Sequence, residues 1–503
     1  MSSVSRPILA DLLGAIPVAA VRGSTDIAVS GVTVDSREVS EGSVFVALAG
    51  LKTDGNQFIA EAIRRGAAAV VSEHPPPIGV GIAATWVEAR EIRSAPGLLA
   101  ARFHRYPSTR IRLVGVTGTN GKTTTAYLLD GIFARLAPPS AMLGTVVRRI
   151  GAMASPARHT TPEAPALQAF LAQAVEAGCR YGALEVSSHG LALGRVEGTE
   201  FDCAIFTNLT RDHLDFHSDM EDYFAAKRRL FQLYLRPEGT AVIGTDDAFG
   251  RRLAESLSVP ILTYGFVADA GLRVGEFEAS FEGLAIRFSE QGVERGLSSP
   301  LIGRHNVLNL LAAFGAARAL GFEAEPVLEA LAEQRGAPGR FEKVEAGQPF
   351  YVIVDYAHTD DALRNLLEAV ASLPHRRMIT VFGCGGDRDR SKRPLMGAVA
   401  ARLSDLVVLT SDNPRTEDPL GIIREIELGT GGPQARAEVR VEPERRRAIA
   451  LALALAAAED VVLIAGKGHE THQVVGDRVL HFDDREVVRE LLGAPARSAP
   501  SPG

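Results

Sequence analysis

The residues with the clearest chemistry lie in the segment Val114-Gly-Val-Thr-Gly-Thr-Asn-Gly-Lys-Thr-Thr-Thr125. An apolar run from Ile111 to Val116 predicts a buried strand, and a helical pattern from Thr124 to Leu136 follows a glycine-containing turn. This order places backbone N–H groups and a helix N-terminus around a phosphate chain. Lys122 can reach the outer phosphates, and the Thr123 hydroxyl can bind Mg²⁺. The segment therefore predicts that the chain binds a nucleoside triphosphate.

The loop is a variant of the general phosphate-loop pattern, because Val116 stands where G-x-x-x-x-G-K-[ST] has its first glycine. An ordinary Gly-rich turn between a strand and a helix is the alternative interpretation. The strand before the loop, the helix after it and the Lys-Thr-Thr sequence together favour phosphate binding.

Polar segments follow two further predicted strands, where the carboxyl ends of parallel strands form a ligand-binding crevice. Glu185-Val-Ser-Ser-His189 follows the first strand, and its carboxylate can hold Mg²⁺ or its serines can cap a helix. Thr207–His217 follows the second, and it packs Asp212, His213, Asp215 and His217 into six residues. This loop predicts either a metal-binding active-site loop or a solvated polar loop. Lys227 lies in a helical pattern and, taken alone, is typical of a surface lysine.

The last two-fifths of the chain, from about residue 303, repeat this arrangement. Asn306 and Asn309 are three residues apart and share one helical face, where they can reach a base or cap the helix. Four polar loops then follow apolar runs: 355–358, 383–390, 411–415 and 466–470. Four such loops at one sheet edge predict a binding site. Arg388 and Arg415 suit a carboxylate-bearing ligand, because guanidinium groups bind carboxylates bidentately.

Length and composition bound the class of protein. A chain of 503 residues predicts two to four domains. The net charge of −7, with no long Lys/Arg run, argues against nucleic-acid binding. Three scattered cysteines predict buried thiols in a reducing compartment. Because we find neither a signal pattern nor an apolar run of about 18 residues, we expect a cytoplasmic protein, with Leu451–Ala458 in a buried helix.

The alternation of strands, polar turns and helices predicts an α/β fold with three domains. We expect an N-terminal α/β domain over residues 1–105 and a central parallel-sheet ATPase domain of the P-loop type over 106–337. A Rossmann-like α/β domain is expected over 338–493, after the Gly/Pro-rich hinge at 335–340. The composition of the tail, 494–503, predicts disorder.

Together these motifs resemble those of the Mur ligases, which add amino acids to the cell-wall precursor in an ATP-dependent, amide-forming reaction. The similarity runs over about residues 28 to 490 and rests on Thr117–Thr124, Glu185–Gly190, Asn208–Asp215, Gly303–Asn309 and Asp355–His358. Within the family, the chain is similar to members that add the third residue to UDP-N-acetylmuramoyl-L-alanyl-D-glutamate. Asp412-Asn-Pro-Arg415 resembles the motif of members that use meso-2,6-diaminopimelate, whose second carboxylate Arg415 can bind.

The resemblance implies a set of residue roles for ATP and Mg²⁺. It implies a Mg²⁺ site formed by Thr123 and Glu185, a second ion on His213, and a lysine, Lys227, that CO₂ converts into a metal-binding carbamate. The implied catalytic residues are Lys122, Lys227 and His213. The implied ATP contacts are Gly118, Thr119, Asn120, Gly121, Lys122, Thr123, Thr124, Asn306, Arg340 and Asp355.

The resemblance also assigns the two other substrates. The N-terminal domain would bind the UDP precursor, and the C-terminal domain would bind the amino acid. The implied precursor contacts are Val34, Ser36, Leu51, Lys52, Thr53, Thr160, Thr161, Ser187 and Arg195. The implied diaminopimelate contacts are Arg388, Asp412, Asn413, Pro414, Arg415, Gly466 and Glu470. We expect a monomer with small-molecule substrates in cytoplasmic peptidoglycan precursor synthesis, without nucleic-acid or membrane partners.

Three alternatives remain at this point. The same ligase could add L-lysine in place of diaminopimelate. A folylpolyglutamate-type ligase shares the central ATP domain, although such ligases begin near the phosphate loop. A non-catalytic P-loop regulator is the third alternative, and the four loops of the C-terminal domain argue against it.

Overall fold

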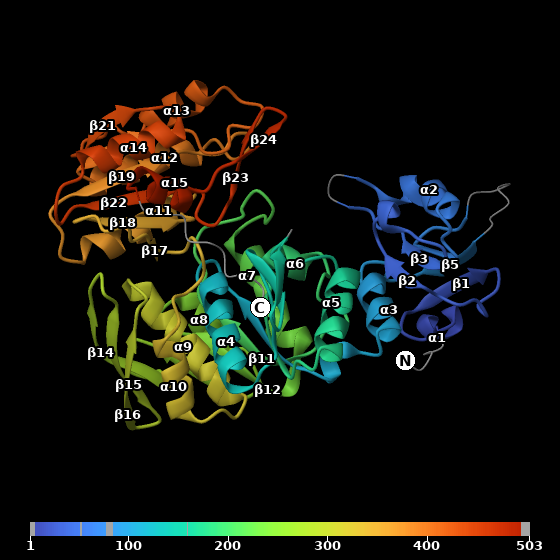
Figure 1. Cartoon of the computed structure of the whole chain (residues 1–503). Coiled ribbons are helices and arrows are strands. Elements are labelled where there is room, and N and C mark those ends of the chain that lie inside the picture. The colour runs from blue at the N-terminus through green and yellow to red at the C-terminus, as the bar shows by residue number, and fades with distance from the viewer. Residues whose placement is uncertain (1–5, 51–52, 77–83, 158, 494–503) are drawn as a thin grey trace.

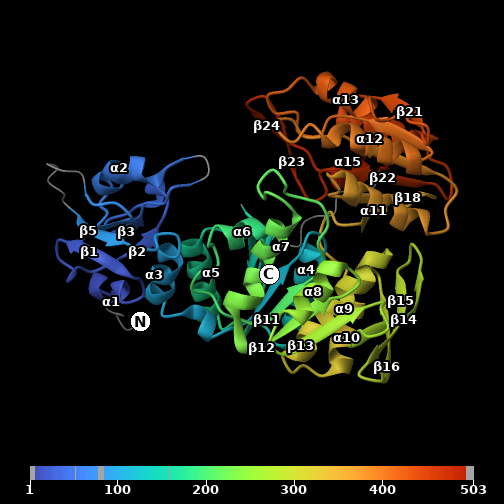
Figure 2. The same cartoon turned by 180° about the vertical axis from the view of Figure 1, so that it is seen from behind.

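A computed structural model describes residues 6–50, 53–76, 84–157 and 159–493. The chain forms three α/β domains, each built on its own sheet (Figure 1). The predictions for Leu51, Lys52 and the tail 494–503 lie outside the described residues. The C-terminal domain and the N-terminal domain lie on different sides of the central domain, a relation that the view from behind also shows (Figure 2).

The N-terminal domain has a five-stranded sheet in the order β1-β5-β4-β3-β2. All neighbours in it are parallel except β1 and β5. Helix α3 lies against α5 of the central domain (Figure 1). It also approaches the segment after α6, because a Cβ on Gly97 of α3 would collide with the backbone of Glu197. The elements are α1 (Leu9–Leu13), β1 (Val18–Arg22), β2 (Gly31–Thr33), η1 (Ser36–Glu38), β3 (Ser43–Val46), η2 (Gly55–Phe58), α2 (Ile59–Arg64), β4 (Ala69–Ser72), β5 (Thr85–Ala89) and α3 (Ala95–Phe103).

The central domain has an eleven-stranded sheet in the order β16-β15-β14-β13-β12-β11-β6-β10-β7-β8-β9. Its middle is parallel, as predicted, but β8, β9, β15 and β16 pair antiparallel at the two ends. The strands are β6 (Arg112–Thr117), β7 (Ser140–Leu143), β8 (Val147–Ile150), β9 (Met153–Pro156), β10 (Tyr181–Glu185), β11 (Phe201–Phe206), β12 (Leu235–Gly244), β13 (Ile261–Gly265), β14 (Leu272–Ala279), β15 (Leu284–Glu290) and β16 (Val293–Ser299).

Antiparallel strands thus extend the predicted parallel sheet at both ends, which the alternation of strands and helices did not indicate. The alternation of buried and exposed residues along Leu284–Phe288 is the signature of a strand with one solvated face. The turn at Gln291–Gly292, where both residues have positive φ, joins it to β16 as a hairpin. These strands extend the sheet without adding a crossover helix.

Helices cover both faces of the central sheet. Val114 and Val116 pack on the face covered by α4, α9 and α10, whereas Leu113 belongs to the core under α5 and α7. This alternation follows from the two-residue period of a strand. The helical elements are η3 (Pro107–Thr109), α4 (Lys122–Leu136), α5 (Ala164–Glu176), α6 (Ser188–Ala192), α7 (Met220–Arg229), the π-turn η4 (Leu230–Tyr234), α8 (Ala248–Glu255), α9 (Arg304–Ala319) and α10 (Ala324–Ala332).

The C-terminal domain follows the linker that contains the predicted hinge. Its six-stranded sheet has the order β17-β18-β22-β19-β20-β21, parallel except for β17, and a separate hairpin, β23–β24, follows. The elements are β17 (Glu342–Lys343), β18 (Tyr351–Asp355), α11 (Asp360–Ala371), β19 (Met378–Phe382), α12 (Lys392–Leu403), β20 (Leu406–Leu409), α13 (Pro419–Glu427), β21 (Glu438–Val441), α14 (Arg445–Leu455), β22 (Val461–Ala465), β23 (His472–Val475), β24 (Arg478–His481) and α15 (Asp484–Leu491).

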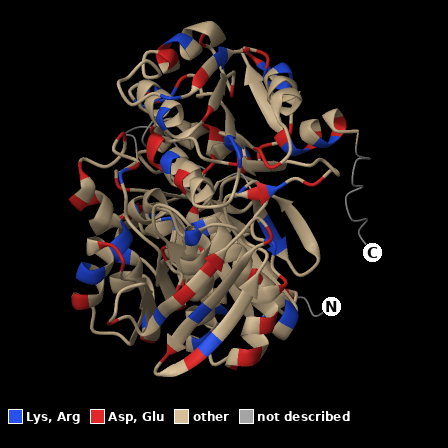
Figure 3. Cartoon of the chain, turned by 90° about the vertical axis from the view of Figure 1, so that its left-hand side faces the viewer, with Lys and Arg blue, Asp and Glu red and all other residues tan. Residues whose placement is uncertain are grey.

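Other compositional predictions can be compared with the structure. The three cysteines are buried and free, as predicted. The apolar run that begins at Leu451 forms the end of α14, which stops at Leu455. In the described part of the chain, no helix is long and apolar enough to cross a membrane. Charged groups of both signs are interspersed in the view of Figure 3, in keeping with the small net charge.

Candidate active site

The phosphate loop lies between β6 and α4, and the helix begins at Lys122 rather than at Thr124. Gly121 precedes the helix with φ 86°, and a Cβ there would collide with the Asn309 side chain. Lys122 Nζ donates to the carbonyl oxygens of Gly118 (2.9 Å) and Thr119 (2.8 Å). The loop therefore folds around its own lysine, with the first N–H groups of α4 directed at the same space.

Glu185 ends β10, the strand next to β6, and so lies beside the phosphate loop. The residue is 1% exposed, and its carboxylate accepts hydrogen bonds from the Thr123 hydroxyl (2.9 Å) and from the backbone and hydroxyl of Thr145 (2.7 and 3.0 Å). Ser187, two residues later, caps α6 by accepting from Gly190 N. The Ser187 contact confirms the capping interpretation of the 185–189 segment, whereas Mg²⁺ binding by Glu185 stays a prediction.

Lys227 is buried, with 1% of its surface exposed, so the isolated prediction of a surface lysine was wrong. Its Nζ donates to Gly118 O at 2.7 Å, the carbonyl that also accepts from Lys122, and it lies 4.5 Å from the Tyr223 ring centroid. Burial, followed by repulsion from Lys122, holds the pKa of Lys227 well below its ordinary value. The side chain is therefore disposed to be a neutral amine at the phosphate loop.

The loop after β11 brings aromatic and imidazole rings to the same place. His213 has φ 53°, and its ring lies 4.9 Å from that of His189, which stacks on Phe216 at 4.1 Å. Burial lowers the pKa of His213 to about 4, which favours the neutral, metal-binding form. Among the described residues, no group of three or more His, Cys, Asp or Glu side chains could hold a metal ion. The loop therefore does not form a metal site by itself.

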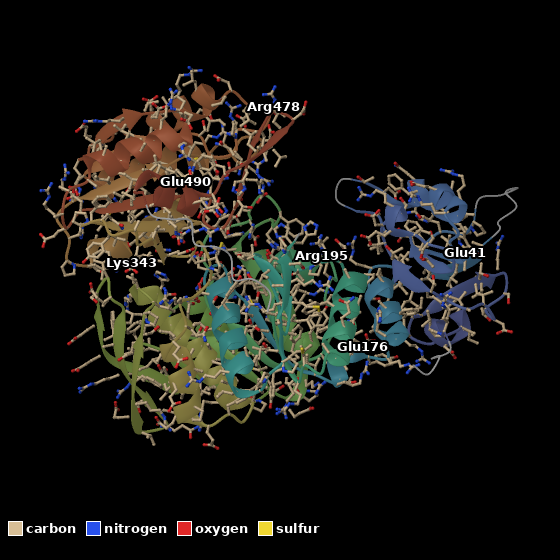
Figure 4. All side chains as sticks on the ribbon, viewed as in Figure 1. Glu41, Glu176, Arg195, Lys343, Arg478 and Glu490 are labelled. Carbon is tan, nitrogen blue, oxygen red and sulfur yellow. The ribbon has the colours of Figure 1, made fainter. Side chains whose placement is uncertain are left out.

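Four of the residues predicted to contact the precursor form one network beside Glu185. The Thr161 hydroxyl donates to Glu185 O (2.9 Å) and lies 3.1 Å from the Ser187 hydroxyl. Arg195 donates to Thr161 O (3.0 Å), and the Thr160 hydroxyl is 3.0 Å from that of Thr145. Arg195 lies at the edge of the central domain that faces the space between the other two domains (Figure 4).

A cavity of about 450 Å³ lies where the N-terminal domain meets the central domain. Leu48 and Ala49, just before the predicted contact Thr53, line one side, and Gly194, next to Arg195, lines the other. Ser36 is buried and donates to Glu61 (3.2 Å), and Val34 is half-buried on the preceding segment. The remaining lining residues are Glu73, Glu91, Ile92, Arg93, Ser94, Glu197 and Arg229.

Asn309 of α9 borders the phosphate loop beside Gly121 and Thr125, and the other predicted ATP contacts lie on α9, in the linker and at the end of β18. Asn306 is not the helix cap, because α9 begins at Arg304; its amide donates to Ile302 O (2.8 Å) and accepts from Asn309 (2.9 Å). The Asp355 carboxylate accepts from Phe341 N (2.6 Å) and Ala357 N (2.7 Å). Arg340, in the linker, lies 4.6 Å from the ring centroid of Tyr356.

The structure brings together the predicted amino-acid-binding loops of the C-terminal domain. Arg415 adopts a left-handed backbone (φ 51°) and donates to Gly386 O at 2.7 Å. Asn413 donates to Glu470 at 2.8 Å. A Cβ on Gly385 would lie 2.9 Å from the Arg415 guanidinium and 3.7 Å from Cγ of Arg388, so both arginines border this glycine. The third loop joins at Gly466, which approaches the Asp412 carboxylate.

Comparison with known proteins assigns this chain to a family. The model of the Mur ligase middle domain matches residues 116–317, that of the glutamate ligase domain matches 339–468, and that of the Mur ligase family catalytic domain matches 28–104. The chain belongs to the Mur ligase family. It is thus an ATP-dependent, amide-bond-forming ligase, and membership of the family implies the use of ATP and Mg²⁺.

Three relatives of this Mur ligase carry the same name, UDP-N-acetylmuramoyl-L-alanyl-D-glutamate--2,6-diaminopimelate ligase. The protein of Solibacter usitatus is 46% identical over 92% of this chain and 93% of its own length. That of Thermosynechococcus vestitus is 48% identical over 92% and 93%. A solved structure with this name is 34% identical, covers 97% of this chain and 99% of its own, and has a TM-score of 0.70.

Sequence reasoning about this Mur ligase missed Lys467, which lies between two predicted contacts, Gly466 and Glu470. Its side chain is fully buried, and Nζ donates to His472 O (2.6 Å), Glu470 (3.1 Å) and Asn413 (3.4 Å). Asp412 completes the cluster at 3.7 Å. The sequence feature that could have identified Lys467 is its position inside the Gly466–Glu470 loop. A single lysine in a polar loop, however, does not indicate that its side chain is buried.

Proposed function

We propose that this Mur ligase adds meso-2,6-diaminopimelate to UDP-N-acetylmuramoyl-L-alanyl-D-glutamate in peptidoglycan precursor synthesis. The reaction is an ATP-dependent amide-bond formation between the free D-glutamyl carboxylate and an amine of diaminopimelate. A cytoplasmic location and a monomeric state are parts of the same proposal.

The observation that carries the choice of amino acid is the composition of the loop cluster around Asp412–Arg415. Arg415 and Arg388 supply cations for a carboxylate, and Asp412 and Glu470 supply anions for an ammonium group. Asp412 Oδ1 is buried 3.7 Å from Lys467 Nζ and has no hydrogen-bond partner among the described residues, so it can still accept a hydrogen bond from a ligand. Diaminopimelate has a second α-amino-carboxylate end that matches this pattern, whereas L-lysine lacks the second carboxylate.

The donor set near the phosphate loop fits Mg²⁺ once Lys227 is carboxylated. A neutral amine reacts with CO₂ to give a carbamate, and the burial of Lys227 beside Lys122 favours the neutral amine. Thr123, Glu185, His213 and carboxylated Lys227 would hold Mg²⁺, which then neutralises phosphate charge. Asn306, Arg340 and Asp355 complete the proposed ATP site, together with the phosphate loop from Gly118 to Thr124.

The first chemical step that we propose is transfer of the terminal phosphoryl group of ATP to the D-glutamyl carboxylate. Lys122 offsets negative charge on the transferring group, because its ammonium lies within the phosphate loop. The product is an acyl phosphate, and attack by the diaminopimelate amine then expels phosphate and forms the amide. The linker around Arg340 lets the C-terminal domain close over the acyl phosphate and exclude water.

The precursor would lie between the N-terminal and central domains. The cavity lined by Leu48 and Gly194 lies between the two domains, and Gly194 adjoins Arg195 of the network that includes Thr160, Thr161 and Ser187. The contacts proposed on the N-terminal side are Val34, Ser36, Leu51, Lys52 and Thr53. This arrangement would direct the peptide end of the precursor toward Glu185 and the phosphate loop. It also gives the N-terminal domain a role that a folylpolyglutamate-type ligase does not need.

Amino-acid-dependent release of phosphate from ATP tests the proposal. The purified protein is given Mg²⁺, bicarbonate, ATP and UDP-N-acetylmuramoyl-L-alanyl-D-glutamate, with either meso-diaminopimelate or L-lysine. We expect release with diaminopimelate and at most slow release with lysine. Release with lysine alone would contradict the role of Arg415, and release with neither would contradict the ligase reaction itself.

A further inference from the structure

Of the side-chain hydrogen bonds among the described residues, one joins the central domain to the C-terminal domain. The Thr210 hydroxyl, in the loop after β11, donates to the Asp361 carboxylate in the first turn of α11 at 3.0 Å. Apolar contacts hold the domains together elsewhere, including the stacked rings of Phe281 and Tyr351 at 3.9 Å. The polar contact therefore stands apart from the apolar part of the interface.

Thr210 is also bound to the phosphate loop. Its hydroxyl accepts from the Asn120 side-chain amide (3.4 Å), and its backbone N–H donates to the Thr119 hydroxyl (3.0 Å). Asn120 is fixed in turn by Asn208, which accepts from its N–H (3.0 Å) and donates to its carbonyl (3.2 Å). The chain of donors runs from Asn120 through Thr210 to Asp361 and ends on a charged acceptor, the stronger kind of hydrogen bond.

We propose that the Thr210 hydroxyl couples the phosphate loop to docking of the C-terminal domain, with Asn120 and Asp361 as its two partners. Thr210 and Asp361 are positioning residues, since neither needs to touch a substrate to act. A nucleotide that orders Asn120 would orient the Thr210 hydroxyl toward Asp361, which favours the docked position of the domain that carries the amino acid. This inference rests on the proposed function for its kinetic consequences but not for its structural ones.

The chain offers a matched set of variants. Thr210→Val removes the hydroxyl and keeps the shape, as well as the hydrogen bonds of the backbone N–H and carbonyl with the Thr119 hydroxyl (3.0 and 3.2 Å), whereas Thr210→Ser keeps the hydroxyl. Asp361→Ala removes the acceptor. Asp360→Asn is the control, because Asp360 lies beside Asp361 in the first turn of α11 and also pairs with Arg364, at 3.7 Å. Asp360→Asn changes the charge at the same helix end but leaves the Thr210–Asp361 hydrogen bond between the domains in place.

Hydrogen exchange of the full-length protein is the first readout, with β,γ-methylene-ATP and Mg²⁺ as the probe. We expect the nucleotide to slow amide exchange in peptides that cover α11 in the wild type, in Thr210→Ser and in Asp360→Asn. In Thr210→Val and Asp361→Ala, the nucleotide is expected to leave exchange in α11 unchanged while it still slows exchange in α4. Equal nucleotide-dependent protection of α11 in the wild type and Thr210→Val would overturn the proposal. Loss of this protection in Thr210→Ser would also overturn it.

Kinetics supply the second readout. We expect Thr210→Val to lower kcat about tenfold, the scale that one hydrogen bond to a charged group carries, and to weaken binding of β,γ-methylene-ATP by up to the same factor, because the coupling is reciprocal. The double variant Thr210→Val/Asp361→Ala should have a kcat no lower than that of either single variant, because each substitution removes the same hydrogen bond. Additive losses, or an equal loss in Asp360→Asn, would contradict the coupling. An inactive wild type would contradict the proposed function instead, and hydrogen exchange would still decide the coupling.

Discussion

Two buried lysines, one in each of the domains that would meet during the reaction, have opposite surroundings. Lys227 of the central domain lies against a carbonyl, a tyrosine ring and a second lysine, and burial and repulsion lower its pKa. Lys467 of the C-terminal domain lies among Asp412, Glu470 and backbone oxygen. The surroundings thus favour a neutral amine in one domain, which we propose reacts with CO₂, and an ion-paired lysine in the other.

The difference teaches that burial alone does not assign a role to a lysine. A buried ion pair with carboxylates holds three loops in one geometry, and its removal leaves charges without partners. A buried lysine beside another cation gains nothing from charge, so its neutral form is favoured. The partners, which come from distant parts of the chain, decide between the two outcomes.

The largest effect is expected for loss of the Lys227 side chain. Lys227→Ala should lower the ligase rate by about a thousandfold or more, as for removal of a group that stabilises charge in the transition state. Added formate or chloride should restore part of the activity, because a small anion can occupy the place of the carbamate. Absence of rescue would count against the carboxylated lysine. Arg228→Ala, one residue further along α7, serves as the control and should retain activity.

A smaller effect is expected at the amino-acid site. Arg415→Met should raise the KM for diaminopimelate by about 10- to 100-fold, the scale of a hydrogen bond between charged groups, and leave the KM for ATP unchanged. Steady-state kinetics with each substrate varied in turn would measure this. An unchanged KM for diaminopimelate would contradict the assignment of Arg415.

The two lysines should respond with opposite signs to one substitution. Lys467→Met should lower the free energy of unfolding by about 3 kcal/mol, because it leaves Asp412 and Glu470 without their buried cation. Lys227→Met should raise it by roughly 1 kcal/mol in CO₂-free buffer, since folding of the wild type must bury an amine that the unfolded chain keeps protonated. Urea unfolding measures both. The same sign for both substitutions would show that their surroundings do not differ as described.

The pH dependence of stability should sharpen the contrast further. Because the folded state lowers the pKa of Lys227, the unfolded chain binds more protons between that lowered pKa and the ordinary value for lysine. In CO₂-free buffer, the wild type should therefore gain stability relative to Lys227→Met as the pH rises through this window. A difference that stays constant with pH would contradict the lowered pKa.

The smallest effect is expected for a surface pair in the same domain as Lys467. Arg440 and Glu438 are 2.7 Å apart, and their side chains are 40% and 61% exposed. Arg440→Met should change the free energy of unfolding by less than about 1 kcal/mol, because solvent screens such pairs. Urea unfolding would measure it beside Lys467→Met. A loss as large as that of Lys467→Met would mean that burial is not what distinguishes the two pairs.

Local patterns were enough to predict much of this molecule. Neighbouring residues were enough to locate the phosphate loop, from its glycines and Lys-Thr-Thr. They were also enough to locate the polar loops after the C-terminal strands. The antiparallel strands β15 and β16 were missed because they add no helix to the alternation. Lys467 and Asp361 were missed because their importance comes from contacts with loops far away in the sequence, and no local pattern encodes burial or pairing across domains.

The most direct test of the central claim is ¹³C NMR of the protein equilibrated with ¹³C-bicarbonate. A carbamate on Lys227 should give one carbamate resonance in the wild type that persists in Lys467→Arg and disappears in Lys227→Met. A resonance that survives in Lys227→Met, or its absence from the wild type, would contradict the account of Lys227 as the carboxylated residue.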